Sequence, residues 1–378
     1  MALRKRIGIV YSYDESWIGG TYYYQNLVRS LKLLPDNKKP HVVIICSDKD
    51  SFGTIKGIKY PYASYHTLDE KQNPLINSVK KVLNLNVYNA SNNFGIDVLF
   101  HPSELTILKS IEHHLYWIPD FQEAKFPHLF PEEFLEIRQK TQKELLFASK
   151  HVMFSSKDAL NDFNTLYPNS ETQKYVVNFK VFHPNYSDIK FKSIKRKYFL
   201  KNEPYFFSPN QFWEHKNHIL VLKAVKILRD QYNTKCYVVF SGKEYDVRNP
   251  NYFKDLVQYV KDNDLDELVK FLGFIDRKDQ LFLMKNALAV IQPSLFEGWS
   301  TVVEDAKAMN QNIIVSNLEV HKEQLEDQGY YFDPTNESQL IEQMLLFINT
   351  TVDKPEYYYK EKLGSFGEEF INVIDQLT

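Results

Sequence analysis

The sequence predicts an α/β protein made of two Rossmann-like, doubly wound domains. Two observations predict this class. Short apolar runs alternate with amphipathic helical patterns along all 378 residues, and the alternation stops once near the middle and then restarts. Alternating elements of this kind are typical of parallel sheets covered by helices on both faces. A chain of this length can also bury two separate cores. Because ligands bind at the carboxyl ends of such strands, we expect a cleft between the two domains.

The first half of the chain contains six apolar runs that we interpret as strands and three helical patterns between them. The expected strands are 6–12, 41–46, 97–100, 114–118, 151–154 and 174–182, and the expected helices are 20–34, 132–148 and 157–166. Residues 186–203 are basic, have no clean period and end before Pro204. We therefore expect a linker there, with a first domain at 1–188.

The second half restarts the alternation and defines a second domain at 189–355. Its expected strands are 204–208, 236–242, 269–274, 288–292, 312–316 and 330–332. Three of its expected helices span 251–262, 277–286 and 336–348, and two more start at 216 and near Ser300. The terminal stretch 356–378 also has a helical pattern, which Gly364 and Gly367 weaken in its middle.

The composition excludes several classes of protein. Apolar residues make up 43% and charged residues 25% of the chain, and the net charge is −2, so there is no electrostatic reason to expect nucleic-acid binding. Cys46 and Cys236 lie in apolar runs, which favours buried thiols over a disulfide, and no zinc-ligand spacing is present. Without a signal peptide or a membrane span, we expect a cytoplasmic protein. Contact of the basic stretch 192–201 with a membrane surface stays an alternative to a solvated linker.

The segment "LAVIQPSLFEGWSTVVEDAKAM" (288–309) carries the chemistry, because it predicts a buried strand, a turn and a helix. The free N–H groups at the start of the helix and the positive end of its dipole form an anion site. Gly298 lets a ligand approach the backbone closely. Glu297, on the loop, is suited to accept hydrogen bonds from a polyol.

Helical periodicity distinguishes the two later acids of this segment. Val302, Ala306 and Met309 share one face, which we expect to lie on the sheet. Asp305 lies at the edge of that face and is expected to face the cleft. Glu304 lies nearly opposite, so we expect it to be solvated and to complement the helix dipole.

The stretch "PSLFEGWSTVVEDAKAM" resembles the signature of retaining GT-B glycosyltransferases, the family-4-like glycosyl transferases group 1. The family has two Glu residues eight positions apart; Glu297 matches the first, and Asp305 replaces the second. The resemblance implies that Glu297 binds donor-sugar hydroxyls, and that the shorter Asp305 makes a looser or water-mediated contact with the ribose. It also implies that the segment of Trp299, Ser300 and Thr301 lies along the sugar and the diphosphate, and that the last helix crosses back to the first domain.

Four further segments carry the same resemblance. "SPNQFWEHKNHILVLKAVKIL" (208–228) implies that Lys216 binds the donor diphosphate, although Asn210 stands where many members have an Arg. "GFIDRKDQLFLMKNA" (273–287) implies that the nucleotide base lies against the backbone of Phe274 and Ile275. "SWIGGTYYYQNLVRSL" (16–31) resembles a glycine-rich loop, which implies that Gly19 and Gly20 direct N–H groups at the diphosphate. "YWIPDFQ" (116–122) matches an acceptor-side His-Asp pair at Asp120 only, because Pro119 replaces the His.

The resemblance implies a retaining hexosyltransferase. It would move a mannose-like or glucose-like sugar from a GDP- or UDP-sugar to a hydroxyl of a glycan or lipid-linked glycan, in bacterial surface polysaccharide synthesis. The resemblance also implies that this reaction needs no metal or other cofactor. Two other functions stay open: a nucleotide-sugar epimerase of the same architecture, and a catalytically weak sugar-nucleotide-binding subunit.

Other motifs give weaker support for other classes of enzyme. Asp48 and Asp50 form a D-x-D string after a strand, as in metal-dependent glycosyltransferases of the other major fold, but a second α/β half has no place in that fold. No G-x-G-x-x-G fingerprint supports a dinucleotide oxidoreductase. The histidines near strand ends, His101, His113 and His114, are interpreted as structural.

Overall fold

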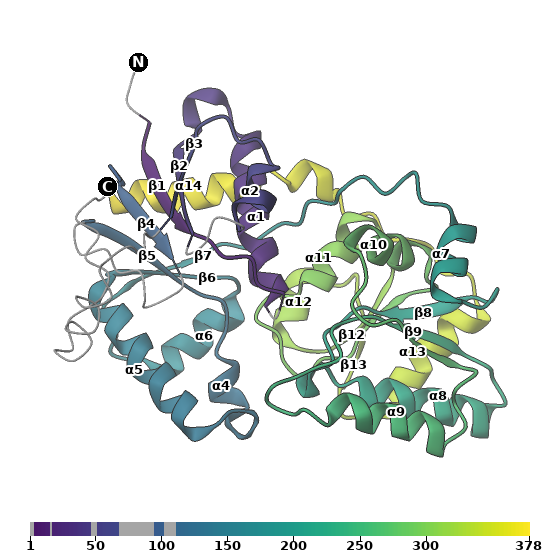
Figure 1. The fold of residues 1–378 in the computed structure, drawn as a ribbon. Helices are drawn as coiled ribbons and strands as arrows, with labels where there is room; N and C mark the ends of the chain where they lie inside the picture. Colours follow the sequence, from purple (N-terminus) through teal and green to yellow (C-terminus); the bar gives the residue numbers. More distant parts are fainter. Residues whose placement is uncertain (1–3, 16, 47–50, 68–93, 102–110) are drawn as a thin grey trace, which may run out of the picture. The chain divides into compact units, whose positions relative to one another are not determined.

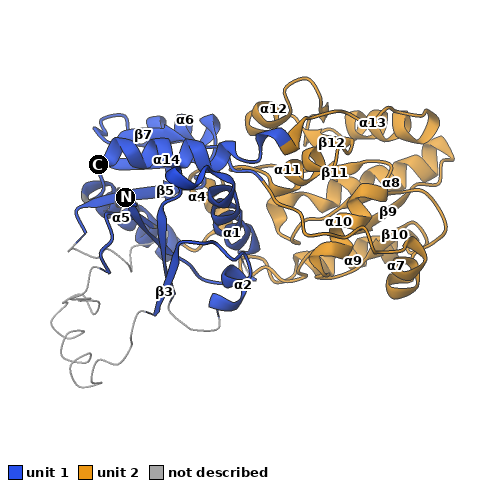
Figure 2. Ribbon diagram, turned by 90° about the horizontal axis from the view of Figure 1, so that it is seen from above, with its two compact units in different colours: residues 1–121, 132–180, 361–378 blue, residues 122–131, 181–360 orange. Residues whose placement is uncertain are grey.

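The computed structural model describes residues 4–15, 17–46, 51–67, 94–101 and 111–378. Asp48 and Asp50 lie outside these described residues. The chain forms two compact units, Met1–Phe121 with Glu132–Lys180 and Glu361–Thr378, and Gln122–Pro131 with Val181–Lys360 (Figure 2). After the insertion 122–131, the chain passes into the second unit again after residue 180, eight residues before the boundary expected from the sequence, and it returns to the first unit at residue 361.

The first unit contains a parallel sheet with the strand order β3-β2-β1-β4-β5-β6-β7. Its strands are β1 (Arg6–Val10), β2 (His41–Cys46), β3 (Ala63–Thr67), β4 (Val98–His101), β5 (His113–Ile118), β6 (His151–Phe154) and β7 (Gln173–Val176). Helices α1 (Ile18–Leu33) and α14 (Ser365–Leu377) cover one face, and α5 (Glu132–Ala148) and α6 (Lys157–Leu166) cover the other (Figure 1). The short α2 (Phe52–Lys56) follows β2.

The second unit contains a parallel sheet with the strand order β10-β9-β8-β11-β12-β13. Its strands are β8 (Tyr205–Ser208), β9 (Tyr237–Phe240), β10 (Val269–Phe271), β11 (Val290–Gln292), β12 (Ile313–Ser316) and β13 (Tyr330–Phe332). Helices α8 (His218–Tyr232), α9 (Tyr252–Asp262) and α13 (Glu337–Asn349) cover one face, and α10 (Arg277–Asn286), α11 (Thr301–Ala308) and α12 (Glu319–Leu325) the other (Figure 1). The order reverses between β8 and β11, and this switch is where Rossmann-like sheets bind ligands.

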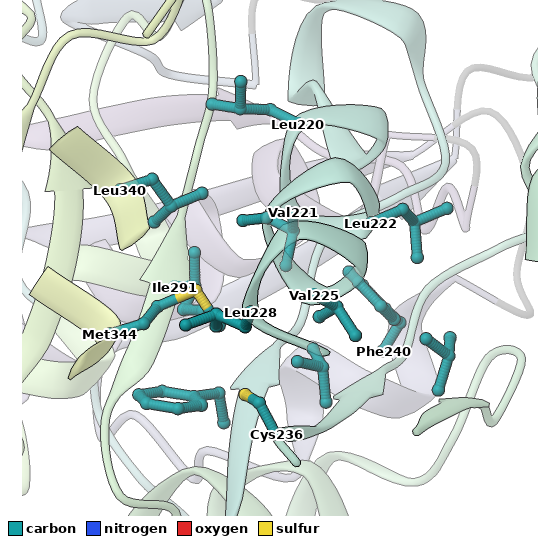
Figure 3. Packing of buried hydrophobic residues seen from close by; sticks show 14 of the residues in the cluster. Leu220, Val221, Leu222, Val225, Leu228, Cys236, Phe240, Ile291, Leu340 and Met344 are labelled. Carbon is teal, nitrogen blue, oxygen red and sulfur yellow. The ribbon is translucent and has the colours of Figure 1, made fainter. Parts of the chain in front are cut away.

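The core of the second unit lies between its sheet and α8 with α13. Figure 3 shows Val221, Val225 and Leu228 of α8 next to Phe240, Ile291 and Met344, which come from β9, β11 and α13. All six side chains are fully buried. The β-strand residues are apolar without alternation because the sheet is covered on both faces. This rigid layer fixes the loops at the carboxyl ends of β8 and β11.

Helix α14 belongs to the first unit, where it packs along α1. Gly367 donates its N–H to Ser30 Oγ at 2.8 Å, and a Cβ atom at this position would lie 2.9 Å from the backbone of Ser30 and Leu31. Gly367 therefore allows the two helices to approach closely, which explains why a residue of low helix propensity occupies the helix. Phe366 and Phe370 of α14 are fully buried, against Tyr23 and Phe100 respectively.

One expectation about the elements is wrong. Residues 191–198, interpreted as part of a linker, form helix α7 (Phe191–Tyr198). The helix buries Ile194, and Lys197 and Tyr198 both donate to Asp279 of α10, at 2.5 and 2.7 Å. The basic residues concealed this helix, because they occupy its outer face and its last turn while a single aliphatic residue points inward.

The two cysteines are buried free thiols, which confirms the prediction for Cys46 and Cys236. No helix among the described residues is long and apolar enough to cross a membrane.

Candidate nucleotide-sugar site

The structure brings Lys216 and Glu297 together at the strand-order switch of the second unit. Lys216 ends a 3-10 helix (Glu214–Lys216) in the loop after β8, and Glu297 lies on the loop after β11. Because β8 and β11 are adjacent parallel strands, the loops at their carboxyl ends are neighbours. Lys216 Nζ lies 2.7 Å from Glu297 Oε1, and both side chains are more than four-fifths buried.

The Glu297 carboxylate is held at one oxygen only. Oε1 accepts hydrogen bonds from Lys216, from Gln292 Nε2 at 2.5 Å and from Ser294 Oγ at 2.6 Å. Within the described residues, no donor reaches Oε2. Burial acts to raise the pKa of the Glu297 carboxyl, but the positive charge of Lys216, the nearby His321 and the hydrogen bonds from Lys216 and Ser294 together outweigh burial and hold that pKa below its ordinary value. The group is therefore an oriented carboxylate whose second oxygen is available to a ligand.

The first turn of α11 has two backbone N–H groups without acceptors among the described residues. Ser300 donates its N–H to Gln324 Oε1 at 3.0 Å, and Val303 donates to Ser300 Oγ at 3.4 Å. Among the residues that the structure describes, no acceptor lies within hydrogen-bond distance of the N–H groups of Thr301 and Val302. Both residues are half-buried. They provide the donors of an anion site, with the positive end of the helix dipole behind them.

A buried histidine lies behind this loop. His321 Nδ1 lies 2.8 Å from the Ser316 carbonyl oxygen, and Ser316 Oγ donates to the Ser294 carbonyl at 2.7 Å. Burial lowers the pKa of His321 to about 4, although Glu297 acts to raise it. His321 is thus neutral at physiological pH and donates from Nδ1, which fixes the end of β12 against the Glu297 loop.

The two later acids of the motif are both buried. Asp305 Oδ1 accepts from Arg277 Nη2 at 2.5 Å and from His183 Nε2 at 2.9 Å. Burial acts to raise the pKa of Asp305, but Arg277 and His183 outweigh it, and the pKa is lowered. The prediction that Glu304 is solvated is wrong, since its side chain has no exposed surface.

The error for Glu304 has a physical reason. Its carboxylate accepts from the Tyr359 hydroxyl at 2.6 Å and from Gln324 Nε2 at 3.0 Å. Helical periodicity describes one face against the sheet, whereas α11 is also covered by α12 and by the segment that contains Tyr359. Similarly, Val303 rather than Val302 is fully buried with Ala306.

The remaining predicted donor-binding residues of the second unit lie on the loops after β8, β10 and β11. Asn210 is buried after β8, and its Nδ2 donates to Ser208 Oγ at 3.3 Å. A Cβ atom at Gly242, after β9, would lie 2.0 Å from the Asn210 carbonyl oxygen, so only glycine fits there. Gly298 is half-buried and Trp299 is buried on the same loop as Glu297. After β10, Phe274 is half-exposed and Ile275 is half-buried.

Three predicted residues belong to the first unit. Gly19 and Gly20 lie in the first turn of α1 rather than in a loop before it, and Gly20 donates its N–H to the Trp17 carbonyl at 3.0 Å. A Cβ atom at Gly20 would overlap the Trp17 ring, at 2.4 Å from its nearest atom. Asp120 is half-buried and lies two residues after the end of β5.

Sequence reasoning missed several residues that shape the site. They are Gln292, Ser294, Arg277, His183, Gln324 and His321. Gln292 had a signal, because it is a polar residue at the end of an otherwise apolar strand whose carboxyl end faces the ligand side. Gln324 and His321 had none, because α12 was not expected. No cluster of His, Cys, Asp and Glu among the described residues is arranged to hold a metal ion.

Comparison with solved structures defines the class of fold. The crystal structure of HepE from Anabaena in complex with UDP and glucose superposes with a TM-score of 0.68, at 14% identity, over 99% of this chain and 95% of that chain. The protein has the GT-B fold, in which two Rossmann-like sheets occur in one chain. This confirms the predicted fold class.

Comparison of sequences finds a family that matches most of the second unit. Residues 190–362, less than half of the chain, match the family of glycosyl transferases group 1, in agreement with the predicted resemblance to that group.

Two curated relatives are similar to part of the chain. The O-antigen chain mannosyltransferase RfbU of Salmonella typhimurium is 29% identical over 150 residues, 39% of this chain. The capsular polysaccharide biosynthesis glycosyltransferase CapH of Staphylococcus aureus is 25% identical over 180 residues, 47% of this chain. The matches span 40% and 48% of the lengths of these relatives.

Proposed function

We propose that the protein is a retaining glycosyltransferase that transfers a hexose from a nucleoside diphosphate sugar to a hydroxyl group of a glycan. One observation carries the proposal. At the strand-order switch of a Rossmann-like sheet, a buried lysine, a carboxylate with one available oxygen and two available N–H groups at a helix start occur together. A cation and helix N–H groups suit a diphosphate, and a carboxylate oxygen suits a sugar hydroxyl.

Each group has a defined task in this reaction. Lys216 and the N–H groups of Thr301 and Val302 stabilise the negative charge that develops on the diphosphate as the glycosidic bond breaks. One such hydrogen-bond donor in a water-excluded site lowers the activation barrier by about 3 kcal/mol. Glu297 Oε2 accepts a hydrogen bond from a sugar hydroxyl and orients the ring. Because Lys216 already contacts Glu297, the two groups need little rearrangement when the donor binds.

The partners follow from the same resemblance and from the relatives. We propose a GDP- or UDP-activated mannose or glucose as donor, with the ribose close to Asp305 and the base close to Phe274 and Ile275. RfbU and CapH, by their names, act in O-antigen chain and capsular polysaccharide biosynthesis, which supports a surface-polysaccharide acceptor. Asp120 stays the acceptor-side candidate. The reaction as proposed needs no metal ion.

The test begins with binding. We expect GDP or UDP to raise the thermal unfolding midpoint of the native chain, since a ligand of the folded state stabilises it. Lys216→Ala should abolish most of that shift, whereas Lys223→Ala, which removes an exposed lysine of α8, should leave it unchanged. No shift with any nucleoside diphosphate would reject the proposal.

Turnover then separates the remaining functions. With a donor sugar and a glycan acceptor, Glu297→Gln should lower kcat by roughly 10²–10³-fold, as for loss of one preorganised electrostatic contact, and EDTA should have no effect. An epimerase would convert the sugar without any acceptor. A binding subunit would bind the nucleotide and show no turnover for Glu297→Gln to reduce.

A further inference from the structure

Glu304 is a buried carboxylate that the proposed reaction does not use. Its side chain has no exposed surface, and it lies one helical turn after Ser300, whose carbonyl accepts the Glu304 N–H at 3.1 Å. Burying a charge is costly unless it is fully hydrogen-bonded. Apolar residues would fill the same volume at lower cost. A buried carboxylate here therefore calls for an explanation in terms of the bonds that it makes.

Those bonds lead to two of the places where the chain changes units, 180–181 and 360–361. The Tyr359 hydroxyl donates to Glu304 Oε2 at 2.6 Å and accepts the N–H of Val181 at 2.9 Å. Val181 is the first residue after the chain enters the second unit for the second time, and Tyr359 is the last but one before the chain finally leaves it. Both residues are buried. One hydroxyl group thus joins the two crossing segments and attaches them to α11.

The other oxygen of Glu304 leads to the proposed diphosphate site. Gln324 Nε2 donates to Glu304 Oε1 at 3.0 Å and to the Ser300 carbonyl at 3.1 Å, and Gln324 Oε1 accepts the Ser300 N–H. A contiguous path of hydrogen bonds therefore runs from Val181 through Tyr359, Glu304 and Gln324 to the backbone of Ser300. Ser300 directly precedes the two N–H groups that have no acceptor.

A second contact strengthens the same attachment. His183, two residues into the entering segment, donates to Asp305, which neighbours Glu304 on α11. Two consecutive acids of α11 therefore hold the entering segment, and one of them also holds the leaving segment. Both acids are buried, so these bonds are not weakened by competition with water.

We propose that Tyr359 and Glu304 are positioning residues that couple the crossing segments of the chain to the N-terminus of α11. A backbone change at residues 180–181 or 360–361 then moves the helix start that binds the leaving diphosphate, since satisfied buried networks have discrete arrangements rather than continuous ones. The kinetic part of this inference rests on the proposed function. The existence of the coupled path does not.

The first experiment measures amide hydrogen exchange in the full-length chain without ligand. In Tyr359→Phe, exchange should accelerate at Val181, which loses its acceptor, and also at Ser300, at the far end of the path. The control is Tyr357→Phe, which removes the hydroxyl of another buried tyrosine of the leaving segment, bonded to the Gln328 carbonyl at 3.4 Å, and should change neither amide. Faster exchange at Val181 with none at Ser300 would overturn the proposal, because the path would then end at Tyr359.

The second experiment measures steady-state kinetics well below the unfolding midpoint of each variant. Tyr359→Phe should lower kcat about tenfold and leave the donor KM within about twofold, the range of coupling through such networks. Gln324→Met, which breaks the path at its other end, should lower kcat similarly. The double variant should lose no more than either single one, since both break one path. Additive losses, or a loss confined to the donor KM, would show two separate structural roles and overturn the proposal.

The two experiments also separate this inference from the proposed function. If nucleotides neither bind nor react, the proposed function fails, while exchange at Val181 and Ser300 still decides whether the path exists. If turnover occurs and the double variant is additive, the proposed function stands and the coupling fails.

Discussion

At the scale of single residues, the three acids of the motif at 297–305 differ in their partners and surroundings. Glu297 lies at the carboxyl ends of the strands, and no donor among the described residues reaches its Oε2. Glu304 and Asp305 are buried in the unit and hold other segments against α11. The distinction depends on partners: Glu297 pairs with a lysine at the strand ends, whereas Asp305 pairs with Arg277 of α10. Acids close together in sequence thus differ in burial and in partners, because different segments cover the loop and each side of the short helix that follows it.

The Asp305 pair makes the first prediction at this scale. Asp305→Asn should lower the free energy of unfolding by about 3–5 kcal/mol, because it removes a buried charge that pairs with the partly buried guanidinium of Arg277. The folded-state pKa of Asp305 is lowered, so its contribution is present above the ordinary value of about 3.9 and is lost as the pH falls through the lower folded value. Urea unfolding at pH 7 and between pH 5 and 3 measures both effects.

The control for this prediction is Asp266→Asn, which changes an exposed acid and should alter the unfolding free energy by less than about 0.5 kcal/mol. If Asp305→Asn were equally mild at pH 7, the buried pair would not contribute to stability.

The residues that the sequence predicted and those that it missed differ in a simple physical way. Lys216 and Glu297 were predictable as neighbours, because loops after adjacent parallel strands meet at one sheet edge. The partners of Glu304 and Asp305 were not, because Tyr359 lies 55 residues from Glu304 and His183 lies 122 residues from Asp305. A helical period gives the direction of a side chain, but only the tertiary fold says which segment lies there.

At the scale of elements, α12 (Glu319–Leu325) contributes more to the site than its length suggests. It buries His321 beside the end of β12 and Gln324 beside the start of α11. The sequence offered little signal for it, since "EVHKEQL" is polar and short. The helix α7 was missed for a similar reason. Long periodic helices such as α5 and α6 have the bounds expected from the sequence, because several turns repeat the same pattern.

The neutral state of His321 predicts an acid-sensitive second unit. Its pKa is lowered to about 4 by burial, whereas the unfolded chain has a value near 6.5. The unfolded state therefore binds more protons between these values, and stability should fall as the pH falls from about 6.5 to 4, by on the order of 3 kcal/mol from this group.

The variant His321→Asn tests this without removing the donor to the Ser316 carbonyl, because the Asn amide group can replace Nδ1–H. Its unfolding free energy should depend less on pH between 6.5 and 4 than that of the wild type, while His128→Asn, at an exposed position, should keep the wild-type dependence. Identical pH profiles for all three proteins would contradict the assignment.

At the scale of the whole molecule, the two units exchange chain segments. Residues 122–131 come from the first half of the sequence but belong to the second unit. There, Arg248 donates a hydrogen bond to Gln122 at 3.1 Å. Phe126 packs against Phe296, the neighbour of Glu297. The C-terminal helix α14 joins the first unit (Figure 2). The sequence predicted two α/β domains because both repeat the same alternation. It did not predict the insertion at 122–131, which has no compositional mark.

Because α14 belongs to the first unit, we predict that it stabilises that unit. It should not stabilise the second unit, which contains the groups of α11 and its loop that we propose to bind the nucleotide. Phe370 of α14 is fully buried against Phe100 of β4. Phe370→Ala should lower the stability of the first unit by about 3–5 kcal/mol, whereas Gln376→Ala, on the exposed side of the same helix, should have little effect. In Phe370→Ala, amide hydrogen exchange should accelerate in α1 and β4 and stay unchanged in β8 and β11. GDP or UDP should still protect the start of α11 from exchange. Faster exchange in both sheets together would mean that the two units unfold as one cooperative body, and the separate cores would then not be independent sources of stability.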